Sequence, residues 1–177
     1  MTGQMHLVDF VAGIGNDSTD ELLDEMRAID REANGWVNIR PRPEDNPDPS
    51  AADLAPTPPP SPLNIFGRRR AVTIEGTWVP GRARRSPAEP ASVGLEHPAG
   101  RFAVRQLRDG GLAVPDRWKV VTDHARRGLV LSVPASGSSV DDRAGDLTAI
   151  IDWLVAAAAI LAPDQVTGRW QAEVHTR

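Results

Sequence analysis

A proline-rich run between Pro41 and Pro62 limits what this chain can fold into more than any other feature of its sequence. Each proline removes a backbone hydrogen-bond donor and fixes φ, and the residue before it is pushed out of the helical region. The run contains one large aliphatic residue, Leu54, so it buries too little apolar surface to offset its ordering entropy. We therefore expect a flexible or extended linker at 41–62. It holds nine of the chain's 16 prolines: Pro41, Pro43, Pro47, Pro49, Pro56, Pro58, Pro59, Pro60 and Pro62.

This linker divides the 177-residue chain into two unequal parts. Residues 1–40 are predicted to form an acidic arm, and residues 63–177, long enough for a sizeable core, the main domain. The chain has no cysteine, which excludes disulfides and cysteine-ligated metals. No basic region precedes an apolar run near residue 1, and the longest apolar stretch, 147–162, is too short for a bilayer. We expect a cytoplasmic protein that contacts no membrane.

Charge is distributed unevenly along the chain, whose net charge is −4. Residues 1–62 carry −8, residues 63–127 carry +7 and residues 128–177 carry −3. An arginine-rich composition alone is weak evidence of function, because it follows from genome base composition. Base composition does not sort charge into blocks, however, so the asymmetry predicts surfaces of opposite sign.

The arm, residues 1–40, carries the signals of two strands around one helix. Residues 5–12 have strand composition, and residues 36–40 fit a second, shorter strand. Between them, apolar residues recur at helical spacing, which predicts an amphipathic helix with an acidic outer side. These residues are Leu22, Met26, Ile29 and Ala33. The arm is therefore predicted to be β-α-β.

From residue 70 onward, the main domain shows the order β-α-β-β-α-β. Strands are predicted at 70–79, 118–121, 128–133 and 167–176, and helices at 98–108 and 147–161. A further short strand at 92–96 is an alternative. This order is that of the ferredoxin-like split βαβ motif, although other α+β folds share it. We predict the α+β class with this topology, preceded by the β-α-β arm and the linker.

A polar cluster formed by Asp123, His124, Arg126 and Arg127 lies in the predicted connection between two apolar strands. Functional residues often lie on loops that a rigid scaffold positions. A histidine can act as acid or base near neutral pH, and paired arginines can clamp a carboxylate or a phosphate. The alternative is a solvated hairpin turn, in which aspartate and glycine supply the turn conformation.

Six arginines flank the predicted strand at 70–79 and give residues 68–85 a net charge of +5. On one surface they would bind phosphate groups with salt-dependent affinity, and Trp78 would stack on a base. The acidic helix of the arm is another partner for this surface, and plain solvation of the arginines is a third interpretation. This basic face comprises Arg68, Arg69, Arg70, Arg82, Arg84 and Arg85, with Trp78 beside them.

Neither a metal-binding nor a cofactor-binding motif is found in the sequence. The four histidines, His6, His97, His124 and His175, do not have the spacing of known metal motifs. Gly13-Ile14-Gly15 follows a predicted strand, but the third glycine of the dinucleotide motif and the lysine of the P-loop are absent. We expect neither a metal nor a cofactor.

The sequence favours a non-catalytic interaction or accessory module. Its expected contact surfaces are the proline-rich linker, which suits polyproline II docking, and the basic face. The expected partner is another protein or a second copy of this chain. Two alternatives remain open: an enzyme or small-anion binder that uses the loop at 123–127, with Asp123 and His124 as catalytic candidates, and a nucleic-acid-binding protein that uses the basic face.

Overall fold

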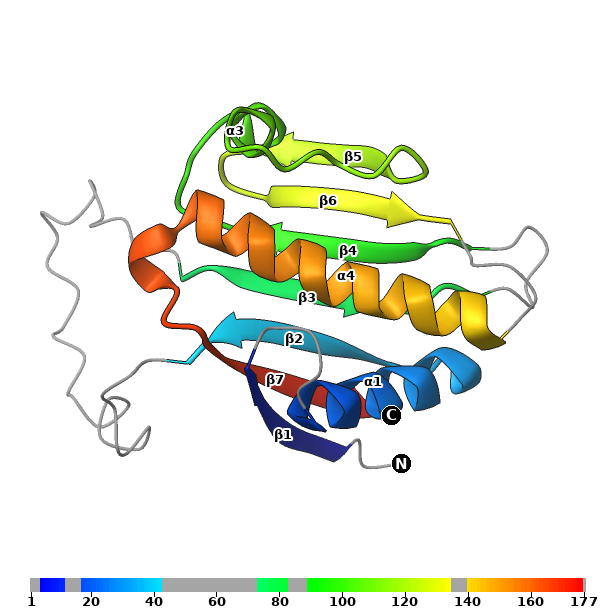
Figure 1. Cartoon of the computed structure of the whole chain (residues 1–177). Coiled ribbons are helices and arrows are strands. Elements are labelled where there is room, and N and C mark those ends of the chain that lie inside the picture. The colour runs from blue at the N-terminus through cyan, green and yellow to red at the C-terminus, as the bar shows by residue number, and fades with distance from the viewer. Residues whose placement is uncertain (1–3, 12–16, 43–72, 83–88, 135–139, 177) are drawn as a thin grey trace, which may run out of the picture.

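The structure, a computed structural model, describes residues 4–11, 17–42, 73–82, 89–134 and 140–176. Within these residues the chain is a mixed α+β protein, as the sequence predicted, with one seven-stranded antiparallel sheet and three α-helices (Figure 1). In chain order the elements are β1 (Gln4–Val11), α1 (Asp17–Glu32), β2 (Gly35–Pro41), β3 (Glu75–Val79), β4 (Ala91–Glu96), α3 (Ala103–Asp109), β5 (Lys119–His124), β6 (Gly128–Val133), α4 (Val140–Leu161), the 3-10 turn η1 (Pro163–Gln165) and β7 (Arg169–Thr176).

The last strand of the chain, β7, pairs with the first two strands. The strand order in the sheet is β1-β7-β2-β3-β4-β6-β5, so β7 lies between the two strands of the predicted arm. It pairs with β1 along eight residues and with β2 along seven. The strands of the arm and those of the main domain therefore belong to one sheet. Strand β2 also runs to Pro41, one residue into the predicted linker, which from residue 43 on lies outside the described residues.

The ferredoxin-like order predicted from residue 70 is not confirmed. The structure has β3-β4-α3-β5-β6-α4-β7 there, because residues 91–96 form a central strand between β3 and β6. In this strand Val93 and Leu95 are buried on the helix side, and Gly94 lies between them. Two apolar residues around a glycine give only a short alternating signal, which is why the sequence presents this strand as an alternative.

The predicted helix at 98–108 is also shorter than expected and begins at Ala103. Gly100 and Phe102 both adopt positive φ angles, which end any helical path that starts before them.

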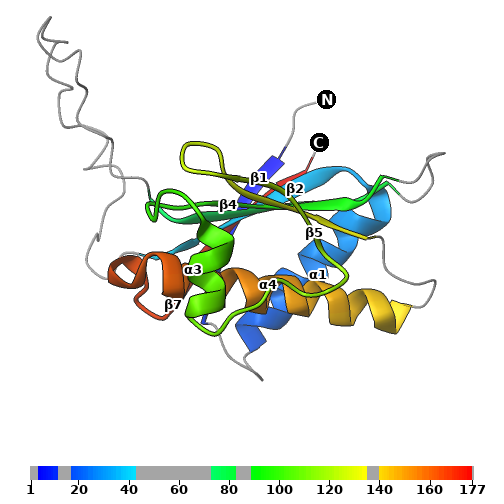
Figure 2. The ribbon, with the colours of Figure 1, turned by 90° about the horizontal axis from the view of Figure 1, so that it is seen from above.

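The helices cover one face of the sheet and leave the other face free of helices in the described part of the chain (Figure 2). Helix α4 crosses the middle of the sheet, and α1 lies over β1, its edge strand (Figure 1). The predicted helix at 147–161 lies within α4, where Leu147, Ile150, Ile151, Leu154 and Leu161 are buried and Val155 is half-buried. Each buried side chain of this size stabilises the fold by roughly 1.5–3 kcal/mol. We call the helix-free side the open face.

Gly35 begins β2 where the chain turns from α1 back into the sheet beside β7. Its φ is +135°, and a Cβ atom added to it would lie 2.2 Å from the backbone oxygen of His175. That oxygen belongs to a neighbouring strand and cannot move without breaking the β2–β7 pairing. The position therefore requires glycine.

We expect Gly35→Ala to lower the free energy of unfolding by at least about 2 kcal/mol, the range of severe point substitutions. Urea unfolding followed by tryptophan fluorescence measures this loss. The matched control is Gly145→Ala in α4, where an added Cβ meets nothing within 4 Å. The control should keep or gain stability, by up to about 1 kcal/mol. Equal stability of the two variants would contradict the argument.

Candidate functional site

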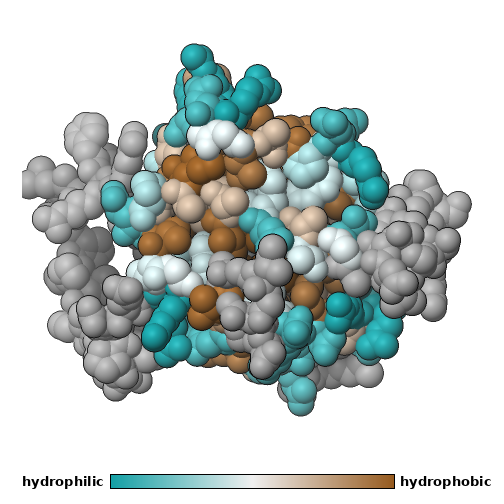
Figure 3. Space-filling view, in the orientation of Figure 1, coloured by the Kyte–Doolittle hydropathy of each residue, from teal (hydrophilic) through white to brown (hydrophobic). Residues whose placement is uncertain are grey.

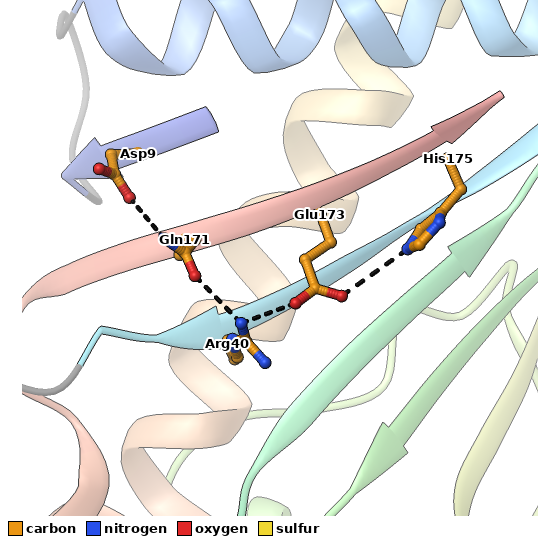
Figure 4. Close-up of polar contacts among 5 residues, drawn as sticks. All are labelled: Asp9, Arg40, Gln171, Glu173 and His175. Atoms are coloured by element: carbon orange, nitrogen blue, oxygen red, sulfur yellow. Dashed lines mark hydrogen bonds and ion pairs between the residues drawn. The ribbon is translucent and has the colours of Figure 1, made fainter. Parts of the chain in front are cut away.

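A network of polar side chains crosses the open face from β1 to β2 (Figure 4). The Gln171 amide on β7 donates to Asp9 Oδ1 at 3.1 Å and accepts, through Oε1, from Arg40 at 3.1 Å. Arg40 also pairs with Glu173 Oε1 at 2.6 Å, and Glu173 Oε2 lies 3.7 Å from His175 Nε2. Five residues from three neighbouring strands are thus held in one chain of contacts.

Strand alternation places this network on the open face. In β7, the apolar residues Trp170, Ala172 and Val174 alternate with polar ones and are buried under the helices. The residues between them consequently point to the opposite face of the sheet. The sequence thus predicted which side chains of β7 share a face, but not their partners on β1 and β2.

Two more residues extend the network at its ends. Arg42 NH1 lies 2.5 Å from Asp9 Oδ2, which neutralises that carboxylate. Trp36, the register partner of His175, stacks on its ring with centroids 4.4 Å apart and planes 10° from parallel. The stack fixes the His175 ring beside the Glu173 carboxylate.

Next to this network, two carboxylates oppose each other across neighbouring strands. Glu75 on β3 and Glu96 on β4 are register partners, and like charges in this position destabilise a sheet. Burial raises the pKa of Glu75 above its ordinary value, the carboxylates of Glu173 and Glu96 raise it further, and Arg40 and His175 oppose the rise. Among the described residues, the Glu75–Glu96 pair is therefore a point where negative charge is only partly compensated.

The predicted cluster at 123–127 has a different geometry from the one expected. Asp123 and His124 belong to β5, so the connection between β5 and β6 is shorter than the predicted one at 122–127. The two Asp123 carboxylate oxygens accept from the Ala103 amide at 3.0 Å and the Val104 amide at 3.1 Å. Asp123 thereby satisfies two free amides at the start of α3, a capping role supplied from a distant strand. Sequence spacing could not show this contact.

The other members of the cluster lie at the turn that follows. His124 Nδ1 accepts from the Arg126 amide at 3.1 Å, so one ring nitrogen is used to shape the turn. Arg126 and Arg127 are exposed to solvent. Asp123 is directed at α3 while His124 Nδ1 serves the turn, so the two residues are not brought together as an acid–base pair.

Most of the predicted basic face lies outside the described residues. This holds for Arg68, Arg69, Arg70, Arg84 and Arg85. Arg82 is described, and its guanidinium Nε lies 3.8 Å from Glu89 Oε2, beside a backbone bridge between the two residues. The expectation of an accessible Trp78 is wrong: its side chain is 1% exposed, because it occupies an inward position of β3 between Thr77 and Val79.

His97 is a buried histidine, and no sequence motif distinguishes it from the other three histidines. His97 follows β4 and is 4% exposed, and neither ring nitrogen has a hydrogen-bond partner among the described residues. Burial lowers the pKa of His97 below its ordinary value, and the Asp123 carboxylate partly opposes this shift. The neutral ring is therefore the form that the folded chain favours.

Neither a spanning helix nor a metal site is found in the described part of the chain. No helix there combines the length and the apolar character needed to cross a membrane. Among the same residues, no group of three or more histidine, aspartate and glutamate side chains is arranged to hold a metal ion.

No protein-family model, curated protein or solved structure matches the chain. Function therefore has to be inferred from the geometry and charge of the open face.

We expect Glu75→Gln to be more stable than the wild type at about pH 8. There the folded chain carries a carboxylate whose raised pKa makes ionisation unfavourable, and the amide removes that cost. The advantage should shrink as the pH falls through the folded pKa towards the ordinary value of 4.5, because the wild-type carboxyl group then binds a proton. Urea unfolding at a series of pH values measures it. Glu32→Gln on the exposed side of α1 is the control, and an equal gain there would contradict the prediction.

His97 should give the opposite pH dependence. Below its ordinary pKa of 6.5 the unfolded chain binds a proton that the folded chain resists, so wild-type stability should fall as the pH drops towards the lowered folded pKa. His97→Leu should lose less stability than the wild type between about pH 7.5 and about pH 5.5. The exposed variant His124→Gln should follow the wild type, and identical slopes for all three would refute the assignment.

Proposed function

We propose that this chain is a non-catalytic interaction module that binds a protein partner on the open face of its sheet. The observation that carries the proposal is the Glu75–Glu96 pair. A folded sheet places these two carboxylates side by side with Arg40 committed to Glu173 and Gln171. Local features that oppose folding stability are typical of functional sites.

Apolar surface further along the same face supports the proposal. Val79 on β3 is 41% exposed, and it shares the open face with Glu75, about 13 Å along the strand, because the two residues are four positions apart. Trp36, on the neighbouring strand β2, offers a flat ring that is already held in place by His175. Rigid aromatic rings of this kind are common at the centres of protein interfaces.

The charge of the pair indicates the chemistry of the partner. An arginine or lysine side chain placed between Glu75 and Glu96 would face two carboxylates and relieve their mutual repulsion. Trp36 and Val79, further along the same face, would contact an apolar residue elsewhere in the partner segment. We therefore propose a basic segment of another protein as the occupant of this surface.

The sequence also predicts contact surfaces away from the open face. The proline-rich linker and most of the basic face offer further contacts for a protein partner, on residues outside the described part of the chain. The small-anion alternative depends on Arg126 and Arg127, which are exposed, while its candidate Asp123 is engaged in capping α3. These contacts favour binding over catalysis at the 123–127 cluster.

The proposal is tested by affinity capture from an extract of the protein's own host, with matched variants of the full chain. We expect the wild type to enrich one or more proteins, and Glu75→Gln combined with Glu96→Gln to reduce their recovery by about tenfold, a loss of about 1.4 kcal/mol of binding free energy. Quantitative mass spectrometry gives the recoveries. Because the substitution removes an electrostatic attraction, raising the salt concentration should weaken wild-type capture in the same direction.

The control for charge is Asp109→Asn combined with Asp116→Asn, two exposed carboxylates of the α3 region. It should retain wild-type recovery. A deletion of residues 43–62 separates the contribution of the linker, and it spares Pro41 and Arg42, which contact β7. Equal recovery by the glutamate variant and the control, or no enrichment over the affinity tag, would overturn the proposal.

A further inference from the structure

The two edges of the sheet are built differently. Within the described residues, β1 and β5 are the outer strands, and each has one neighbour. An edge strand presents unpaired backbone groups to solvent, and proteins usually protect such edges with bulges, charges or short strands. Of β1 and β5, the edge with fewer of these features is the one that could accept a further strand.

The β5 edge carries several protective features. Its pairing with β6 shifts register between Val120 and Thr122, which twists the strand away from a flat edge. Lys119 adds a positive charge, and Asp123 turns its carboxylate towards α3. Addition of another strand to β5 is disfavoured for these reasons.

Within the described residues, the β1 edge lacks that protection up to Asp9, while at its end the Val11 carbonyl accepts from Thr19 Oγ1 at 3.3 Å. All eight of its residues pair with β7 in one uninterrupted register. Met5, Leu7 and Val11 are 56%, 52% and 46% exposed, and they alternate with the inward positions that include Val8 and Phe10, so they line the open-face side of the strand. Asp9 lies among them but is bound by Arg42 and Gln171. A regular edge strand with an apolar side is a template for a further strand.

On the helix side of β1, three glutamates of α1 form an acidic stripe above the strand. His6 Nε2 lies 3.4 Å from Glu25 Oε1, which places this side of the helix above the strand. Glu21 and Glu32 lie four residues before and seven residues after Glu25, and this spacing puts all three on one side of a helix. Both are exposed, and hydrophilic side chains gather over α1 in the space-filling view (Figure 3).

We propose that β1 accepts an extended segment of a partner protein as an eighth strand, and that this segment alternates apolar with basic residues. Its backbone would add hydrogen bonds to the β1 edge before Val11, as in other cases of strand addition. Its apolar side chains would meet Met5, Leu7 and Val11, and its basic side chains would meet the glutamate stripe of α1. The proposal uses the edge of the sheet and stands independently of the Glu75–Glu96 pair.

Charge argues against a second copy of this chain as the occupant. A two-fold pairing of β1 with its copy would bring the same surface of both molecules together. The stripe of Glu21, Glu25 and Glu32 would then face its own copy across the joint, and like charges would repel. A basic segment of another protein meets the same stripe with attraction.

The test uses a fluorescent peptide of eight residues, the length of β1, in which valine and arginine alternate. Titration with the full chain is followed by fluorescence anisotropy, and 15N–1H NMR spectra locate the amides that change. We expect saturable binding with the largest shifts in β1. A control peptide of the same composition, with its arginines grouped at one end, should bind about tenfold more weakly or not at all.

Matched pairs of variants separate this edge from the rest of the surface. Leu7→Lys and Glu21→Lys should each weaken peptide binding by about tenfold or more. Val121→Lys on β5 and Asp116→Lys before it carry the same kinds of substitution at the opposite edge and should bind as the wild type does. Circular dichroism confirms that each variant is folded.

Three results would overturn the proposal. The first is equal binding of both peptides, which would show attraction by charge alone. The second is equal binding by the β1 and β5 variants. The third is a wild-type dimer in sedimentation that Leu7→Lys converts to a monomer, which would assign the edge to a second copy. Peptide binding at β1 does not involve Glu75 or Glu96, so a failure of partner capture at that pair leaves these results unaffected.

Discussion

The pairing of β7 with both β1 and β2 is the interaction on which the rest of the structure depends. It places the last strand of the chain between the first two, so that residues more than a hundred positions apart become neighbours. On the helix side this pairing brings Phe10 and Trp170 within 6.4 Å, between ring centroids. On the open face it lets Gln171 bridge Asp9 and Arg40. The core and the polar network therefore come from one strand insertion.

Much of this fold could be predicted from local patterns, because periodicity reports which side of an element is buried. The alternation in β7 and the spacing of Leu22, Met26 and Ile29 in α1 identified core residues correctly, whereas Ala33, predicted to continue that spacing, lies beyond the end of α1 and is only half-buried. Periodicity does not report which strands are neighbours, however. The insertion of β7 and the central position of β4 follow from long-range pairing, for which a single sequence carries no comparable signal. The same limit explains why the capping of α3 by Asp123 could not be predicted.

The candidate site shows this limit most clearly. The alternation of β7 is enough to predict that Glu173 and His175 share a face, but only the register of β3 with β4 sets Glu75 opposite Glu96. Trp78 shows a different error, in which a residue predicted to be accessible is buried. The predicted stacking on a base required an exposed ring, yet strand alternation and the helix cover bury it. Sequence neighbours are poor guides to burial in a strand, because successive side chains point to opposite faces.

The pairing of some carboxylates with arginines, and not of others, explains why both proposed surfaces would bind the same kind of partner. The acidic first part of the chain supplies β1, α1 and β2, and its arginines at positions 40 and 42 neutralise Glu173 and Asp9 on the open face. Negative charge then remains at the Glu75–Glu96 pair, where Arg40 and His175 oppose it only in part, and along the glutamate stripe of α1. Exposed apolar surface accompanies each charge, at Val79 further along β3 in the first case and on the open-face side of β1 in the second. A partner that is both basic and partly apolar satisfies both surfaces, whereas an acidic or purely polar partner satisfies neither.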